Sequence, residues 1–188
     1  MVTYPFERRV RSGKQVIAMA CSMAGLAIAC GPTASTLPGT ALGTYNVSGS
    51  LQSNSCGGGL GAPNPWNFTA QMSQDGTTLY WEPSGGTQIY GAMSSSTKVD
   101  ITSTQTANVD ATEGGAEGPC DLQSTTAVDL TLSASSPPAA FTGTITYTFA
   151  ASTGVSSTTD CTDQLTASGG TYDTLPCTLS YTVTGSRQ

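Results

Sequence analysis

The stretch VDLTLSASSPPAAFTGTITYTF, residues 128–149, decides the fold of this chain. On both sides of Pro137-Pro138, every second position is apolar or glycine, and the positions between carry Asp, Ser or Thr. The alternating set is Val128, Leu130, Leu132, Phe141, Gly143, Ile145, Tyr147 and Phe149. A period of two residues is typical of a strand with one apolar and one polar face. The stretch therefore predicts two antiparallel strands that turn at the prolines.

The same alternation recurs along the chain, in segments rich in Thr, Val, Tyr and Ile, which fit a pleated surface. The other strands that we expect are residues 42–51, 66–72, 77–82, 88–94, 97–102, 107–111 and 178–184, of which 97–102 and 107–111 carry the weakest pattern. Beyond residue 30, no segment of ten or more residues shows helical periodicity. The fold class that we expect is therefore all-β.

About eight or nine strands joined by consecutive hairpins predict an up-and-down antiparallel meander, because strands adjacent in sequence usually pair. Closing the meander into a lipocalin-like barrel removes its exposed edges, so we favour a barrel. A two-sheet sandwich is the alternative, which periodicity alone does not separate from a barrel.

The N-terminal stretch has the pattern of a secretory signal. Arg8, Arg9, Arg11 and Lys14 precede the uncharged run Val16–Cys30. A basic region followed by an apolar run of this length is typical of a cleaved signal peptide. The alternative, a transmembrane helix, needs about 20 apolar residues, and this run is shorter and ends at Gly31 and Pro32.

The end of that run, Ala27-Ile28-Ala29-Cys30, resembles the lipobox of bacterial lipoproteins. The resemblance implies that the Cys30 thiol receives a diacylglycerol and that Cys30 becomes the first residue. The motif departs from the family at Ala27, where Leu is usual, and ordinary secretory cleavage after Ala29 is the alternative. Cysteine parity favours lipidation, because Cys30 is then used and an even set of four cysteines remains.

The resemblance divides the chain into a signal peptide (1–29), a lipidated N-terminus with a flexible tether (30–40) and a single β domain (41–188). Several acyl chains hold such proteins stably at a membrane. Gly31 stands where the family's inner-membrane retention signal has Asp, which implies the outer membrane of a bacterial cell envelope. The β domain is also loosely similar to small envelope lipoproteins of unknown function, a likeness that transfers no site residues.

Four cysteines follow the tether: Cys56, Cys120, Cys161 and Cys177. Sequence alone allows three pairings. We expect Cys120 to begin a long strand and Cys161 to lie beyond the end of its partner, so a hairpin that turns near Pro138 brings the two to one end of the sheet. In a closed barrel, the first and last strands are neighbours and bring Cys56 close to Cys177. We therefore predict these two disulfides, against a competing local Cys161–Cys177 bond. Without a CxxC spacing, and in an oxidising compartment, we expect no metal at these thiols.

Charge argues against nucleic acid as a partner. After residue 29 the chain carries two basic residues, Lys98 and Arg187, and eleven acidic ones, the twelve of the chain less Glu7, so its net charge is −9. Such a chain repels phosphate backbones.

The residues give little sign of catalysis. There is no histidine, which excludes Ser-His-Asp and Cys-His arrangements, and Lys98 has no SxxK motif around it. Glu82 is the best carboxylate for paired-acid hydrolysis, but nothing places a second one beside it. We expect no enzyme activity, no cofactor and no metal. Asp160, Asp163 and Asp173 suit calcium by chemistry, but solvated loop carboxylates explain them better.

Four aromatic residues, Trp66, Tyr80, Trp81 and Tyr90, form a candidate platform for a sugar or an apolar ligand. Core packing explains Trp66 and Trp81 better than a ligand role does, and Tyr80 and Trp81 must point to opposite faces of the sheet. The ligand-binding residues thus stay undefined. The function that we expect is a membrane-anchored envelope lipoprotein with a non-catalytic binding or structural role, and the alternative is a lipocalin-like carrier of a small apolar ligand or glycan.

Overall fold

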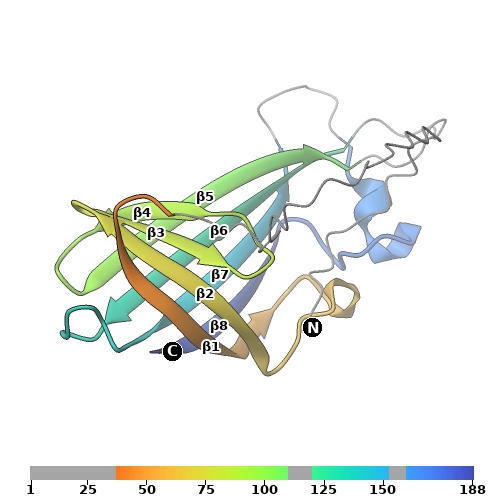
Figure 1. Ribbon diagram of the computed structural model, residues 1–188. Coiled ribbons are helices and arrows are strands. Elements are labelled where there is room, and N and C mark those ends of the chain that lie inside the picture. The colour runs from red at the N-terminus through yellow and green to blue at the C-terminus, as the bar shows by residue number, and fades with distance from the viewer. Residues whose placement is uncertain (1–36, 110–119, 153–159) are drawn as a thin grey trace, which may run out of the picture.

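The computed structural model describes residues 37–109, 120–152 and 160–188. Eight antiparallel strands form one closed barrel (Figure 1). The strands are β1 (Thr40–Asn54), β2 (Trp66–Asp75), β3 (Thr78–Pro83), β4 (Ile89–Met93), β5 (Lys98–Asn108), β6 (Asp121–Leu132), β7 (Ala140–Ala151) and β8 (Cys177–Arg187). Three short 3-10 helices, η1 (Gly58–Leu60), η2 (Thr162–Gln164) and η3 (Thr166–Ser168), lie in the connections.

Each strand pairs with the next one in sequence, and β1 closes the barrel by pairing with β8 from Tyr45↔Arg187 to Asn54↔Leu179. The up-and-down barrel expected from the alternating pattern is therefore confirmed, and the sandwich alternative is wrong. The hairpin in residues 128–149 is β6 and β7, with Val128 opposite Ile145 and Leu132 opposite Phe141.

One expectation about the strands is wrong. The segments 97–102 and 107–111 are not two strands, because β5 runs without a break from Lys98 to Asn108. β6 begins at Asp121, in agreement with the expectation that Cys120 begins a long strand, although the clear alternation starts only at Val128. The two strands pair over their full length, from Lys98↔Thr131 to Asn108↔Asp121. Polar residues at inward positions of both strands interrupt the alternation, which is why the sequence pattern did not predict β5 as continuous.

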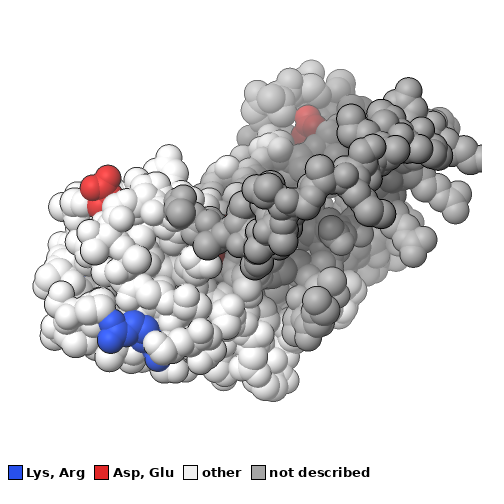
Figure 2. All heavy atoms as spheres, in the orientation of Figure 1, with Lys and Arg blue, Asp and Glu red and all other residues white. Residues whose placement is uncertain are grey.

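The inside of the barrel is apolar and aromatic. Trp81, Tyr45 and Tyr181 are the largest fully buried side chains, and Phe141 packs between Tyr45 and Trp81, each with its ring centroid 5.5 Å away. The outside is polar. On β7 and β8, for example, Thr142, Thr144, Thr146 and Thr148 lie opposite Thr184, Thr182, Ser180 and Thr178. Figure 2 shows the result on one face, where a few charged groups stand apart on a largely uncharged surface.

The two ends of the barrel differ. The turns β2–β3, β4–β5 and β6–β7 lie at one end of the barrel, and η1, η2 and η3 lie at the other (Figure 1). Residues 160–176, which we call the cap, lie at this second end. Tyr172 of the cap packs against Phe149 of β7, and both belong to a second apolar cluster with Leu122 and the four cysteines. The backbone N–H of Asp173 donates to the carbonyl of Cys56 at 2.9 Å and ties the cap to the end of β1.

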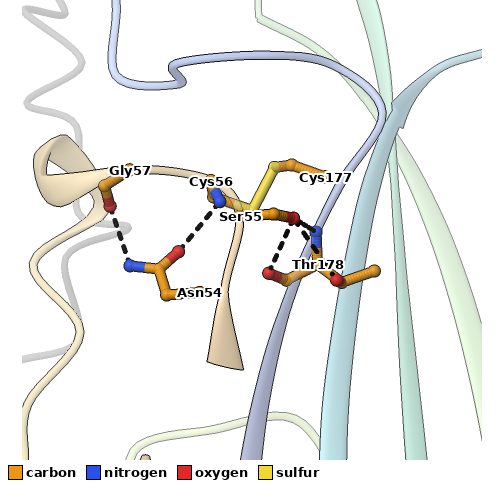
Figure 3. The surroundings of a disulfide bond; sticks show 6 residues. All are labelled: Asn54, Ser55, Cys56, Gly57, Cys177 and Thr178. Carbon is orange, nitrogen blue, oxygen red and sulfur yellow. Dashed lines mark hydrogen bonds between the residues drawn. A yellow bond between two sulfur atoms is a disulfide. The ribbon is translucent and has the colours of Figure 1, made fainter. Parts of the chain in front are cut away.

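Two disulfides hold the capped end, Cys56–Cys177 and Cys120–Cys161, with Cα–Cα distances of 5.0 and 4.7 Å. These are the pairs predicted from the hairpin and the barrel closure, and the local Cys161–Cys177 bond is not formed. Figure 3 shows how hydrogen bonds align the first bridge. The Thr178 N–H donates to Ser55 Oγ at 2.8 Å, and the Cys56 N–H donates to Asn54 Oδ1 at 2.9 Å.

The predicted signal peptide (1–29) and the predicted lipidation site, Cys30, lie outside the described residues. Of the predicted tether, residues 37–40 are described: the carbonyl of Pro38 accepts a hydrogen bond from Ser73 Oγ at 2.6 Å, and Thr40 already belongs to β1. In the described part of the chain, no helix is long and apolar enough to cross a membrane.

Candidate functional site

The barrel wall has a gap between β4 and β5. These strands form only two residue pairs, Ala92↔Asp100 and Met93↔Val99. Beyond Asp100, no residue within 37–109, 120–152 or 160–188 pairs with β5 on the side facing β4. Gly91 still lies against β5, since a Cβ atom there would fall 2.2 Å from the carbonyl oxygen of Asp100. We call the gap beyond it, between residues 89–90 of β4 and 102–108 of β5, the side opening.

The backbone groups that face the side opening follow from strand geometry. The Thr97 carbonyl accepts from the Leu132 N–H at 2.7 Å, and the Val109 N–H donates to the Cys120 carbonyl at 2.9 Å, so odd-numbered residues of β5 bond toward β6. The carbonyl of Lys98 accepts from Ser94 on the other side. Because successive residues of an antiparallel strand bond to opposite sides, the N–H and C=O groups of Thr102, Thr104 and Thr106 face the opening.

A cavity of about 170 Å³ lies behind the side opening. Side chains and backbone from β2, β3, the β3–β4 connection, β4, β5, β6 and β7 line it. The lining residues are Trp66, Phe68, Trp81, Pro83, Gly86, Thr87, Ile89, Ser103, Gln105, Ser124, Thr126, Val128, Ile145 and Tyr147. None of these residues carries a charge.

One wall of the cavity is aromatic. The rings of Trp66 and Phe68 stack with centroids 4.2 Å apart, Trp81 meets Phe68 edge-on at 6.3 Å, and Tyr147 meets Trp66 edge-on at 6.2 Å. Tyr147 also packs against both the main core and the cluster under the cap. The aromatic wall is therefore held by both cores.

The other wall is polar. Ser103 and Gln105 of β5 follow the buried Ile101 at inward positions, and Ser124 and Thr126 of β6 precede the buried Val128 in the same way. Inward residues of a small barrel normally fill its core. These four instead present hydroxyl and amide groups to the cavity.

Strand length explains why the cavity opens to the side. β3 and β4 have six and five residues, whereas β5 and β6 have 11 and 12. Among the described residues, the far half of β5 therefore has no partner strand on its β4 side. Accordingly Gln105 is exposed although it lines the cavity, as are Gly86 and Thr87 of the β3–β4 connection.

The predicted aromatic platform is split by the barrel wall. Trp66 and Trp81 line the cavity, whereas Tyr80 and Tyr90 lie outside, with ring centroids 5.8 Å apart and Tyr90 64% exposed. Sequence reasoning missed the polar wall altogether. The sequence signal that could have revealed this wall is a set of polar residues at inward positions of β5 and β6, in strands whose other inward residues are apolar.

The carboxylates considered for catalysis or calcium lie elsewhere. Glu82 is on the outer face of β3, opposite Gln71. Asp160 accepts hydrogen bonds from the hydroxyl and N–H of Thr162, which lower the pKa of its carboxyl, and Asp163 accepts from Gln164. Among the described residues, no three potential ligands of the types His, Cys, Asp and Glu gather into a metal site.

Comparison with known proteins found no matching family model, no similar curated protein and no similar solved structure.

Proposed function

We propose that the protein is a lipid-anchored envelope lipoprotein whose barrel binds a small, uncharged ligand with a single ring. The observation that carries this proposal is the cavity behind the side opening, with an aromatic wall facing a wall of hydroxyl and amide groups. Small-ligand sites are typically lined by aromatic side chains and a few polar groups that fix orientation.

The size of the cavity limits the ligand. A protein cavity of about 150 Å³ is large enough for a benzene ring, and this one measures about 170 Å³. Aromatic faces such as those of Trp66, Phe68 and Trp81 contact a flat or weakly polar ring well. The ligand, or the part of it that enters, is therefore one ring with its substituents.

The lining also limits the charge of the ligand. A buried charge without a partner costs several kcal/mol or more, and the cavity offers no charged side chain to pair with it. Ser103, Gln105, Ser124 and Thr126 instead suit hydroxyl or amide groups on the ring.

Fluorescence of Trp66 and Trp81 tests the proposal. We expect a saturable change when p-cresol or methyl glucoside, an aromatic ring and a sugar ring, is titrated into the protein. The variant Ser124→Phe fills the cavity and should lose the response. Gln123→Phe places the same ring on the outer face of β6 and should keep it. If neither probe binds the wild-type protein, or if Ser124→Phe binds as well as wild type, the proposal is wrong.

The anchor is a separate part of the proposal and rests on the lipobox-like residues that end at Cys30. We expect the protein purified from membranes to begin at Cys30 and to be heavier than its polypeptide by the mass of its acyl chains. The variant Cys30→Ala should lose this mass. A wild-type chain that begins at Cys30 without added lipid would contradict the anchor and leave the cavity proposal untouched.

A further inference from the structure

We propose that the side opening binds an extended peptide, which pairs with β5 as an added strand and inserts one Tyr side chain into the cavity. This inference rests on the proposed function, because it identifies the ring in the cavity as a side chain of a protein ligand.

The open edge of β5 is the first argument. The N–H and C=O groups of Thr102, Thr104 and Thr106 point into the side opening and have no strand partner among the described residues. Alternate residues with free backbone groups match the hydrogen-bond pattern of another strand. Peptides that add to a sheet edge obtain affinity from these main-chain bonds.

The position of the cavity is the second argument. Side chains of an added strand alternate between the two faces of the sheet, as those of β5 do. A strand placed beside Thr102–Thr106 therefore directs alternate side chains inward, where Ser103 and Gln105 line the cavity. A pocket under an open edge is the usual basis of specificity for alternate peptide side chains.

The two walls select the inserted side chain. A cavity of about 170 Å³ accepts one ring, and its walls offer aromatic contacts on one side and hydrogen-bonding groups on the other. Tyr combines a single flat apolar ring with a polar hydrogen-bonding group and is enriched at interfaces for this reason. The absence of charge in the lining disfavours Asp, Glu, Lys and Arg at the inserted position.

The outer face favours basic residues at the flanking positions of the peptide. Asp100 and Asp129 lie directly opposite each other at one end of the side opening, with Lys98 as a neighbouring cation. Asp121, opposite Asn108, lies at the other end. Outward-pointing Lys or Arg residues of an added strand would complement these carboxylates.

A defined peptide tests this inference. The probe is acetyl-Lys-Thr-Val-Tyr-Val-Thr-Lys-amide, and its control has Gly in place of Tyr. When the first peptide saturates the protein, we expect amide hydrogen exchange at Thr102, Thr104 and Thr106 to slow. We also expect the Gly peptide to bind at least about tenfold more weakly, since burial of an aromatic side chain exceeds the roughly 1.4 kcal/mol that a tenfold change requires.

Two substitutions separate strand addition from ring binding. Thr104→Pro removes an N–H that faces the side opening and should weaken peptide binding about tenfold, because a hydrogen bond is lost and the proline ring blocks close approach. It should leave p-cresol binding unchanged, which also shows that the barrel is folded. Thr104→Val keeps the N–H but loses the hydroxyl contact with Thr125, and should bind the peptide as the wild type does.

The outcomes distinguish the two proposals. If p-cresol binds but the peptide does not, or if Thr104→Pro binds the peptide with wild-type affinity, the strand-addition inference is wrong and the cavity function stands. If neither p-cresol, methyl glucoside nor the peptide binds, both are wrong.

Discussion

Inward-facing glycines set how closely large side chains approach the barrel wall. A Cβ atom at Gly185 of β8 would lie 2.0 Å from the ring of Phe141. That ring is buried and fixed between Tyr45 and Trp81, so it has no room to move away. At Gly49 of β1, by contrast, a Cβ would meet its nearest neighbour, the ring of Trp66, at 3.4 Å.

The variants Gly185→Ala and Gly49→Ala should therefore behave differently. We expect Gly185→Ala to lower the free energy of unfolding by about 1 to 3 kcal/mol, the usual cost of overpacking a core. Gly49→Ala should be close to neutral, since its contacts are ordinary and glycine is itself unfavourable in a strand. Urea unfolding of both proteins checks this, and equal losses would contradict the account of the Phe141 contact.

Buried tyrosines give the protein a stability limit at alkaline pH. Burial raises the pKa of Tyr45, an effect that the positive charge of Arg187 partly offsets, and burial also raises the pKa of Tyr172 and Tyr181. The Tyr45 hydroxyl donates to the Pro138 carbonyl at 2.7 Å and needs its proton for that bond. Above about pH 10, the unfolded chain therefore releases protons that the folded barrel retains.

We expect the melting temperature to fall as pH rises above about 10, the ordinary tyrosine pKa. Between about pH 6 and pH 9 it should change little, because the chain has no histidine. At acid pH, the ionised carboxylate of Asp160 contributes to the stability of the fold, because its pKa is lowered in the folded protein. This stabilisation is present above about pH 4 and is lost below it. Thermal melts, with tyrosinate absorbance measured in parallel, check the alkaline limit. A loss of stability centred near neutral pH would contradict it.

At the scale of elements, β5 and β6 carry an unfavourable pair. Asp100 and Asp129 lie directly opposite each other on the outer face. Because even-numbered residues of β5 bond away from β6, these two residues share no backbone hydrogen bonds. Side chains of an antiparallel pair are closest in this arrangement. Like charges in this arrangement destabilise a sheet by a few tenths of a kcal/mol up to about 1 kcal/mol.

The variant Asp129→Asn should accordingly raise the free energy of unfolding by about 0.2 to 1 kcal/mol, and concentrated salt should reduce the gain because it screens the repulsion. Asp75→Asn, which changes the net charge equally but lies opposite Thr78, should give no comparable gain. Chemical denaturation at low and high salt measures both. A gain that is the same for the two variants would point to net charge rather than to the pair.

The accuracy with which a strand could be predicted from sequence depended on whether its inward residues fill the core or line the cavity. Where they only fill the core, as at Val128, Leu130 and Ile145, strict alternation predicted the strand and its inner face. Where they line the cavity, as at Ser103 and Ser124, the alternation vanished, and β5 was predicted as two short segments. The short pairing of β4 with β5 was not predictable either, because it depends on strand lengths and on the closure of the whole barrel.

At the scale of the molecule, the two disulfides join the capped end across long stretches of chain, with sequence separations of 121 for Cys56–Cys177 and 41 for Cys120–Cys161. Both pairs were predictable because barrel topology places these strand ends together. Cross-links of this kind are expected in an oxidising compartment such as a bacterial envelope.

Removing either bridge should be strongly destabilising. On the chain-entropy model, we expect a loss of about 5 kcal/mol for the double variant Cys56→Ser and Cys177→Ser, and about 4 kcal/mol for Cys120→Ser and Cys161→Ser. Denaturant unfolding of both double variants provides the comparison. If the bridge with the larger sequence separation contributes clearly less, the cap rather than chain entropy determines the effect.

The account as a whole depends on a ring entering the cavity between the aromatic wall and the polar wall. The most direct measurement is the set of nuclear Overhauser contacts between p-cresol and the mature protein. We predict contacts from the ring protons of p-cresol to the indoles of Trp66 and Trp81 and to the side chains of Ser124 and Thr126. Contacts confined to Tyr80 and Tyr90 on the outer face, or no contacts from either p-cresol or methyl glucoside, would contradict the claim that the barrel binds its ligand inside.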